Sequence, residues 1–183
     1  WGHIPVLSLS AQGFEKNPGF KINFPLIDNL VKAIMVGDVF MRVLYRTRPY
    51  EAVPGSANQL YEKWNTRAEA LFSKRVSNHA YNKLMKGIIH DFDTLPLKPI
   101  KKPRVGVVGE ILVKFHPTAN NQIVETIERE GAECVMPDLA DFFFYTFSDD
   151  IIRHRDLKFT MKSALIARLL VWGLELYRKK MKK

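Results

Sequence analysis

The sequence predicts an α/β fold, with a small parallel sheet of about three strands, one βαβ unit and a large helical insertion. Residues 105–108 are an uninterrupted apolar run of the kind that is buried in parallel sheets, and residues 133–136 form a second short apolar segment. A helical pattern with Ile123, Val124 and Ile127 lies between these two segments. Because a doubly wound sheet usually has more strands, we expect an incomplete Rossmann-like domain, a fragment of a longer chain.

The chain divides into three stretches that should form one compact unit. Residues 1–95 begin with a short strand, residues 4–9, and continue as a helical region. Residues 96–103 are a connector rich in proline and lysine, and residues 104–183 hold the βαβ unit and a C-terminal helix. That last helix has an apolar stripe that we expect to be buried: Leu165, Leu169, Trp172 and Leu176.

Three helices are predicted in the helical region. Residues 25–45 are apolar nearly all round, so this helix should be buried on several sides. A second helix is predicted to start at Ser56, which forms a capping box with Gln59. The third has one apolar stripe made of Tyr81, Leu84, Met85, Ile88, Ile89 and Phe92. Further along, Asp138 is expected to cap a short apolar helix that ends at Phe144.

The net charge is +9, but its distribution argues against a nucleic-acid partner. The excess of basic residues lies in the connector and in the C-terminal tail, whereas nucleic-acid-binding proteins usually spread them over a face among aromatic residues. The most apolar stretch, residues 164–176, contains Arg168 and Glu175 and is shorter than the roughly 20 residues that span a bilayer. We therefore expect neither a nucleic-acid nor a membrane partner.

Cysteine and histidine usage points away from a metal site within this chain. Cys134 is the single cysteine, which excludes an internal disulfide and fits a cytoplasmic protein. A [4Fe-4S] cluster usually takes four cysteines, and the five histidines lack the close spacing of a zinc site. No Walker A motif for a nucleotide is present. We therefore expect no metal, no cofactor and no catalysis by this chain alone.

Residues 110–121 form the loop in which a ligand site is most plausible. The loop follows the carboxyl end of a predicted strand and leads into a helix N-terminus, where open α/β sheets bind ligands and free N–H groups attract anions. The expected contact groups are Lys114, His116, Asn120 and Asn121. In the alternative interpretation, Thr118 and Asn120 only cap the helix and Lys114 is solvated.

Asp38 is the second candidate, because a carboxylate is unusual among apolar helix positions. We expect it to form a structural ion pair with Arg42, one helical turn further on. The alternative is a buried carboxylate with a perturbed pKa at a functional site.

Two stretches of the chain contain recognisable motifs. Residues 102–143 include the segment RVGVVGEILVK at positions 104–114, together with His116-Pro117, Asn120-Asn121 and Glu130-Gly131-Ala132. Residues 19–51 include Val36-Gly37-Asp38 and Arg48-Pro49-Tyr50-Glu51. With these motifs the chain resembles the large activase-related proteins of the 2-hydroxyacyl-CoA dehydratase system.

The resemblance implies a C-terminal segment similar to a subunit of a dehydratase or of benzoyl-CoA reductase. Such subunits carry an iron–sulfur cluster, and their partner activases couple ATP hydrolysis to low-potential electron transfer. Because neither set of motifs lies in this chain, the [4Fe-4S] cluster and ATP are implied for the full system, upstream of Trp1.

The preferred interpretation is therefore a segment without a cluster that scaffolds or contacts acyl-CoA. Its implied partners are upstream domains of the same polypeptide or a dehydratase subunit, and a CoA thioester. Two alternatives stay open: a non-catalytic module that docks a subunit or domain, and a domain that binds a small anionic ligand.

Overall fold

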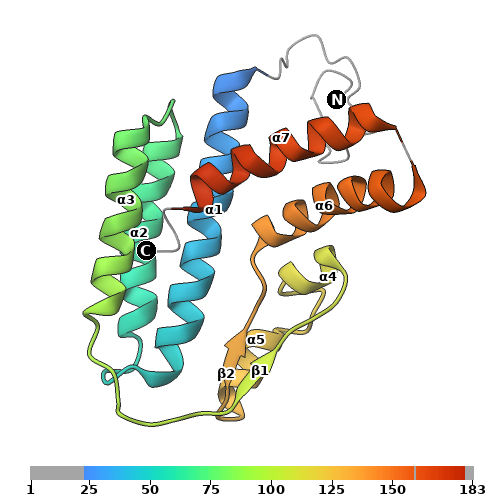
Figure 1. Ribbon diagram of the computed structural model, residues 1–183. Coiled ribbons are helices and arrows are strands. Elements are labelled where there is room, and N and C mark those ends of the chain that lie inside the picture. Colours follow the sequence, from blue (N-terminus) through green and yellow to red (C-terminus); the bar gives the residue numbers. More distant parts are fainter. Residues whose placement is uncertain (1–22, 159, 180–183) are drawn as a thin grey trace, which may run out of the picture.

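Three helices build the main core of the molecule (Figure 1). The computed structural model describes residues 23–158 and 160–179. Helix α1 (Phe24–Thr47) ends in a 3-10 turn, η1 (Arg48–Tyr50), and lies beside α2 (Ser56–Phe72) and α3 (Asn78–Asp93). All three helices were predicted from their apolar patterns. The core between them contains Met35, Val36, Val39, Phe40, Trp64, Ala68, Tyr81, Leu84, Met85, Ile88 and Phe92.

The start of α2 differs from the predicted capping box. Ser56 is the first residue of the helix, and the residue before it, Gly55, has a positive φ of 86°, a conformation that glycine adopts readily. The carboxylate of Glu51 accepts hydrogen bonds from the N–H groups of Gly55 (2.6 Å) and Ala57 (2.8 Å). The free N–H groups of this helix start are therefore satisfied by a residue upstream of the predicted motif.

Close packing between α2 and α3 depends on a glycine. A Cβ atom added to Gly87 would lie only 2.3 Å from Cη2 of Trp64. The indole cannot easily move aside, since it is buried and its Nε1 donates to Oδ2 of Asp91 at 3.0 Å. The absence of a side chain at Gly87 thus leaves room for the Trp64 ring in the core.

A small βαβ unit follows the connector. Strand β1 (Arg104–Gly106) pairs in parallel with β2 (Glu133–Val135), and the chain between them forms α4 (Ile111–Phe115) and α5 (Ile123–Arg129). In the register of the pair, Val105 lies opposite Cys134. A second, smaller core forms here from Val124, Ile127, Ala132 and Cys134, against which Tyr45 of α1 packs.

Two long helices complete the described chain. Helix α6 (Leu139–Leu157) and helix α7 (Met161–Arg178) lie side by side as a hairpin, and both contact α1 (Figure 1). Helix α6 ends at Lys158, which has a left-handed backbone conformation with φ of 55°. The end of the hairpin where α6 ends and α7 begins projects away from α2 and α3, whereas the C-terminal end of α7 lies beside α3.

The predicted fold class is wrong. About 70% of the described residues are helical, and the sheet among them has two strands instead of about three, so the protein is mostly helical and not a Rossmann-like α/β domain. The third predicted strand, residues 4–9, lies outside the described residues. The apolar run at 105–108 contributes Val105 and Gly106 to strand β1 and one more hydrogen bond, from Val107 N–H to the carbonyl of Val135 at 2.9 Å, whereas Val108 is 87% exposed. Helix α6, predicted to end at Phe144, continues to Leu157.

Candidate functional site

The outer face of α7 is an exposed apolar surface. Five large side chains follow one another on this face, and we call them the α7 stripe: Met161, Leu165, Leu169, Trp172 and Leu176. Their exposed fractions range from 45% for Leu176 to 73% for Met161. The prediction that Leu165, Leu169, Trp172 and Leu176 are buried is therefore wrong.

Small residues explain why the opposite face of α7 is the buried one. Ala164 and Ala167 are 3% and 2% exposed, and α7 lies alongside α6. Side chains without bulk let two helices approach closely, and Leu174 and Tyr177 add contacts to the main core. The large residues from Met161 to Trp172 then point away from the protein, whereas Leu176 lies beside α3. The stripe leaves apolar area that other groups can cover.

The loop with the predicted ligand groups contains a short helix, α4, that the sequence did not predict. Glu110 caps this helix: its Oε2 accepts from the N–H of Val113 at 3.1 Å. Lys114 lies within α4, and its Nζ is 4.6 Å from the centroid of the Phe115 ring.

The other three groups in the loop lie between α4 and α5. Asn120 is half-buried and bridges both helices: its Nδ2 donates to the carbonyl of Lys114 (2.9 Å), and its Oδ1 accepts from the N–H of Ile123 (3.2 Å). His116 is exposed, and its Nδ1 accepts from Ala119 N–H at 3.3 Å. Asn121 is exposed, with φ of 55°. Asn120 thus has the capping role of the alternative interpretation, and ligand binding by the loop stays a prediction.

Asp38 caps a helix that begins one hundred residues later in the chain. Its carboxylate is 1% exposed, and Oδ1 and Oδ2 accept from the N–H groups of Leu139 (2.7 Å) and Ala140 (2.9 Å). Burial raises the pKa of Asp38 to about 6, and the nearby Asp138 and Asp141 also raise it, although the two backbone hydrogen bonds act in the opposite direction. Asp38 therefore fixes the start of α6 on α1.

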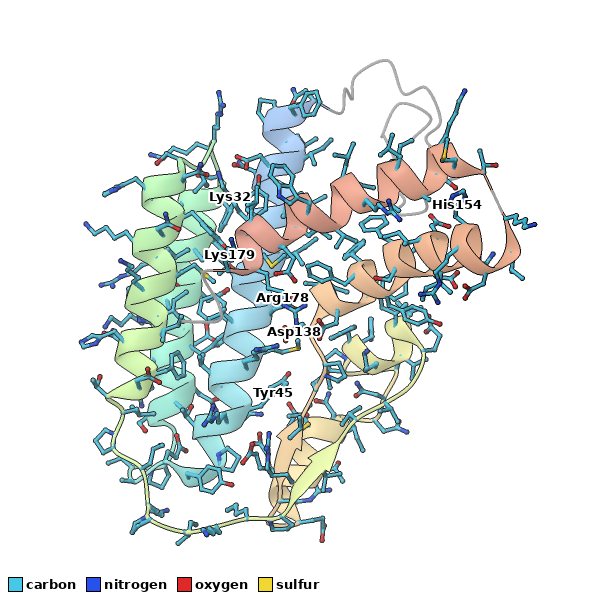
Figure 2. The ribbon with its side chains drawn as sticks, in the orientation of Figure 1. Lys32, Tyr45, Asp138, His154, Arg178 and Lys179 are labelled. Carbon is cyan, nitrogen blue, oxygen red and sulfur yellow. The ribbon has the colours of Figure 1, made fainter. Side chains whose placement is uncertain are left out.

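Arg42 pairs with a different carboxylate from the one predicted. Its Nε and Nη2 donate to Oδ1 (2.7 Å) and Oδ2 (2.5 Å) of Asp138, whose side chain is 1% exposed. Figure 2 shows Asp138 at the start of α6, facing α1. Asp138 was expected to cap α6, but its side chain makes no capping hydrogen bond because Asp38 holds that position. The predicted ion pair between Asp38 and Arg42 is replaced by one that spans two elements.

Further polar contacts join α1 and η1 to the βαβ unit. Arg48 forms a two-pronged ion pair with Glu128 of α5, with Nε to Oε2 at 2.7 Å and Nη2 to Oε1 at 3.0 Å. The hydroxyl of Tyr50 donates to Oε2 of Glu133 at 2.7 Å. Residues 19–51 and 102–143 are thus bonded to each other, and polar residues of both stretches hold the helical part against the βαβ unit.

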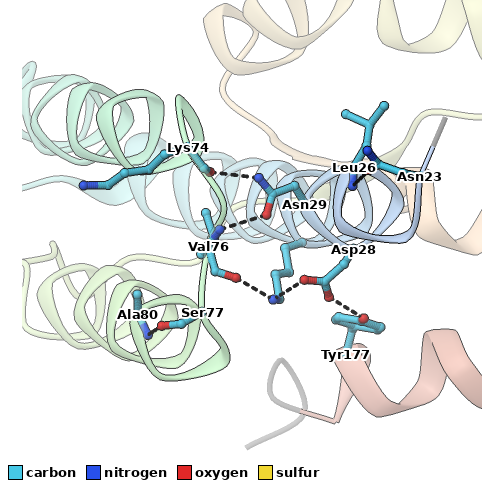
Figure 3. Close-up of polar contacts among 10 residues, drawn as sticks. Asn23, Leu26, Asp28, Asn29, Lys74, Val76, Ser77, Ala80 and Tyr177 are labelled. Carbon is cyan, nitrogen blue, oxygen red and sulfur yellow. Dashed lines mark hydrogen bonds and ion pairs between the residues drawn. The ribbon is translucent and has the colours of Figure 1, made fainter. Parts of the chain in front are cut away.

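Lys32 of α1 is a buried lysine that no sequence pattern indicated, and it lies beside the start of α3. Lys32 is 2% exposed, and its Nζ donates to Oδ2 of Asp28 (2.6 Å) and to the carbonyl of Val76 (2.8 Å), as Figure 3 shows. The hydroxyl of Tyr177, on α7, donates to Oδ1 of Asp28 at 2.6 Å. Burial alone would raise the pKa of Asp28, but the hydrogen bonds from Lys32 and Tyr177 outweigh it and lower this pKa.

An open cavity of about 450 Å³ lies beside this lysine and is lined by Asp28, Lys32, Arg75, Val76, Ser77 and Asn78. Because both charges of the buried pair are satisfied, the arrangement ties α1, α3 and α7 together and leaves no free charge for a ligand within the pair.

Comparisons with protein families, curated proteins and solved structures found no match to this chain. Among residues 23–158 and 160–179, no three His, Cys, Asp or Glu side chains are grouped as a metal site would need. In the same part of the chain, no helix has the length and apolar character needed to cross a bilayer.

Proposed function

We propose that this chain is a docking segment of a protein related to the 2-hydroxyacyl-CoA dehydratase activases, and that the α7 stripe is its docking surface. The observation that carries the proposal is the row of five large apolar side chains exposed on one helix. Each would stabilise a complex by about 1–2 kcal/mol if fully covered, since burying a large apolar side chain is worth roughly 1.5–3 kcal/mol. The sum, about 5–10 kcal/mol, offsets much of the roughly 4–15 kcal/mol that association costs, and polar contacts at the border would add to it.

The rest of the site supports docking more than catalysis. The polar residues of the resembling motifs are bonded within the fold: Asp38 to α6, Arg48 to α5, and Tyr50 to β2. Burial raises the pKa of the Cys134 thiol to about 11, so this side chain is a neutral part of the small core. The cluster and ATP would then belong to the docked partner, in the cytoplasm, and a CoA thioester would contact the loop at Lys114 only within that assembly.

Binding to a cluster-bearing dehydratase subunit from the same organism tests the proposal. Both proteins are purified without oxygen, and complex formation is followed by light scattering and calorimetry. We expect binding by the chain and its loss in Leu169→Glu. A matched control is Tyr145→Glu, which adds the same charge to an exposed position of α6 and should leave binding unchanged. Equal binding by all three proteins would refute docking through the stripe.

A further inference from the structure

The α7 stripe has the spacing of a helix surface that pairs with another helix. Its members follow one another at intervals of 4, 4, 3 and 4 residues along the helix. Alternation between three and four residues keeps side chains on one face and lets them fit between those of an opposing helix. With a rise of 1.5 Å per residue, the stripe is roughly 22 Å long.

Basic residues accompany this stripe along the helix. Among residues 158 and 160–179, which the structure describes, there are five Lys or Arg residues and one acidic residue, Glu175, so the net charge of this stretch is +4. Lys162 and Arg168 are exposed on α7 and Lys179 is exposed just after its end. Arg178 is paired with Asp141 of α6 at 2.8 Å and lies 3.9 Å from Glu175. An incoming surface therefore meets apolar side chains bordered by positive charge.

We infer that the partner which covers the stripe presents an amphipathic helix whose apolar face is bordered by Asp and Glu. This inference rests on the proposed docking function and specifies the chemistry of the partner. Opposite charges at the border of an apolar contact favour the correct partner and speed its association. A helix that lies on a bilayer usually has a charged face opposite its apolar one. The face of α7 opposite the stripe is instead packed, with Ala164 and Ala167 buried and α6 alongside, so we take the occupant to be a helix and not a lipid surface.

Two labelled synthetic helices provide the test, with fluorescence anisotropy as the readout. Both have leucines at alternating intervals of three and four residues; one has Glu at the flanking positions and the other has Lys. We expect the whole chain to bind the Glu peptide at least about tenfold more tightly than the Lys peptide. The ratio should shrink as salt is added, since salt screens exposed charges. Leu169→Glu should abolish binding, and Tyr145→Glu should not.

The outcomes separate this inference from the proposed function. Equal affinity for the two peptides would overturn the acidic partner and leave docking through the stripe intact. Failure of both peptides, together with unchanged binding of Leu169→Glu to the dehydratase subunit, would overturn both. A third arm uses vesicles of phosphatidylcholine and phosphatidylserine. Tighter binding to these vesicles than to the Glu peptide, lost in Leu169→Glu, would overturn the helix in favour of an anionic lipid surface.

Discussion

Replacing Asp38 with asparagine tests how the hairpin of α6 and α7 is fixed to α1. The side chain keeps its size, but the negative charge disappears and one of the two acceptor oxygens becomes an NH₂ group. The carboxamide oxygen can accept from the N–H of either Leu139 or Ala140. The other of these two N–H groups then faces the NH₂ group of the asparagine, which is itself a donor. A buried N–H without a partner costs about 1–3 kcal/mol, so the cap is weaker in the variant at every pH.

The negative charge of Asp38 acts on stability in the opposite direction to its hydrogen bonds, and this effect depends on pH. The folded protein raises the pKa of Asp38 from 3.8 to about 6, roughly two units at about 1.4 kcal/mol each, so its ionised form disfavours folding by at most about 3 kcal/mol. A raised carboxyl pKa gives stability that is fully present below pH 3.8 and is lost as the pH rises through about 6. Asparagine does not titrate, so the variant does not lose stability at this position as the pH rises.

We therefore expect Asp38→Asn to be clearly less stable than the natural protein at pH 4 and to approach it at pH 7.5. Urea unfolding, followed by circular dichroism at several pH values, measures the free-energy difference between the two proteins. This difference should shrink by up to about 3 kcal/mol from acid to neutral pH. Asp150→Asn, which changes an exposed carboxylate of α6, shows how much of the trend comes from net charge alone. A difference that grows toward neutral pH would mean that hydrogen bonding, not burial, dominates at Asp38.

Four further substitutions test other parts of the fold by the same unfolding measurement. Tyr81→Phe should raise stability by about 1 kcal/mol, because the buried Tyr81 hydroxyl has no hydrogen-bond partner in the described part of the chain; a loss of stability would reveal one. Gly87→Ala should cost about 1–3 kcal/mol through its clash with the buried indole, whereas Gly37→Ala, where a Cβ meets nothing within 4 Å, should stabilise α1 by up to about 1 kcal/mol. Arg42→Ala should cost about 3 kcal/mol, since Asp138 would remain as a buried charge without its cation; a cost below about 1 kcal/mol would mean that water reaches this carboxylate.

Local helical structure could be predicted from the sequence because its cause is local. The apolar stripe of α3 predicts the face that this helix buries, and the apolar residues of α1 predict a buried helix from Val31 onward. The expectation that α1 is buried on several sides is wrong for its first two turns, where Leu26, Ile27 and Leu30 are exposed. Helix starts were predicted less well, because the group that caps a helix can come from far away. Glu51 replaces the predicted capping box of α2, and Asp38 replaces Asp138 at α6. Glu51 lies five residues before Ser56, and Asp38 lies 101 residues before Leu139, so neither contact belongs to the four-residue pattern of a capping box.

The fold class was missed for a related reason. An apolar run such as residues 105–108 shows that a segment suits a sheet, but the number of paired residues depends on neighbouring strands. With β2 as its sole neighbour among the described residues, β1 pairs over three residues, and Val108 is left exposed. The second half of α6 was missed because its exposed face mixes Ile152 with charged residues such as Arg153 and Arg155, so a clear apolar period is absent.

The stripe of α7 shows what periodicity can and cannot establish. Leu165, Leu169, Trp172 and Leu176 recur at helical intervals, and this pattern correctly predicts a helix with one strongly apolar face. It does not say whether that face is covered by the same chain. The face that α7 buries is marked by Ala164 and Ala167, because only small side chains allow the close approach to α6. A helix with alanines on one side and large apolar residues on the other has two contact faces. In this fold the alanine face packs against α6, so the face with the large apolar residues is free to bind a partner. The two synthetic helices test that binding directly.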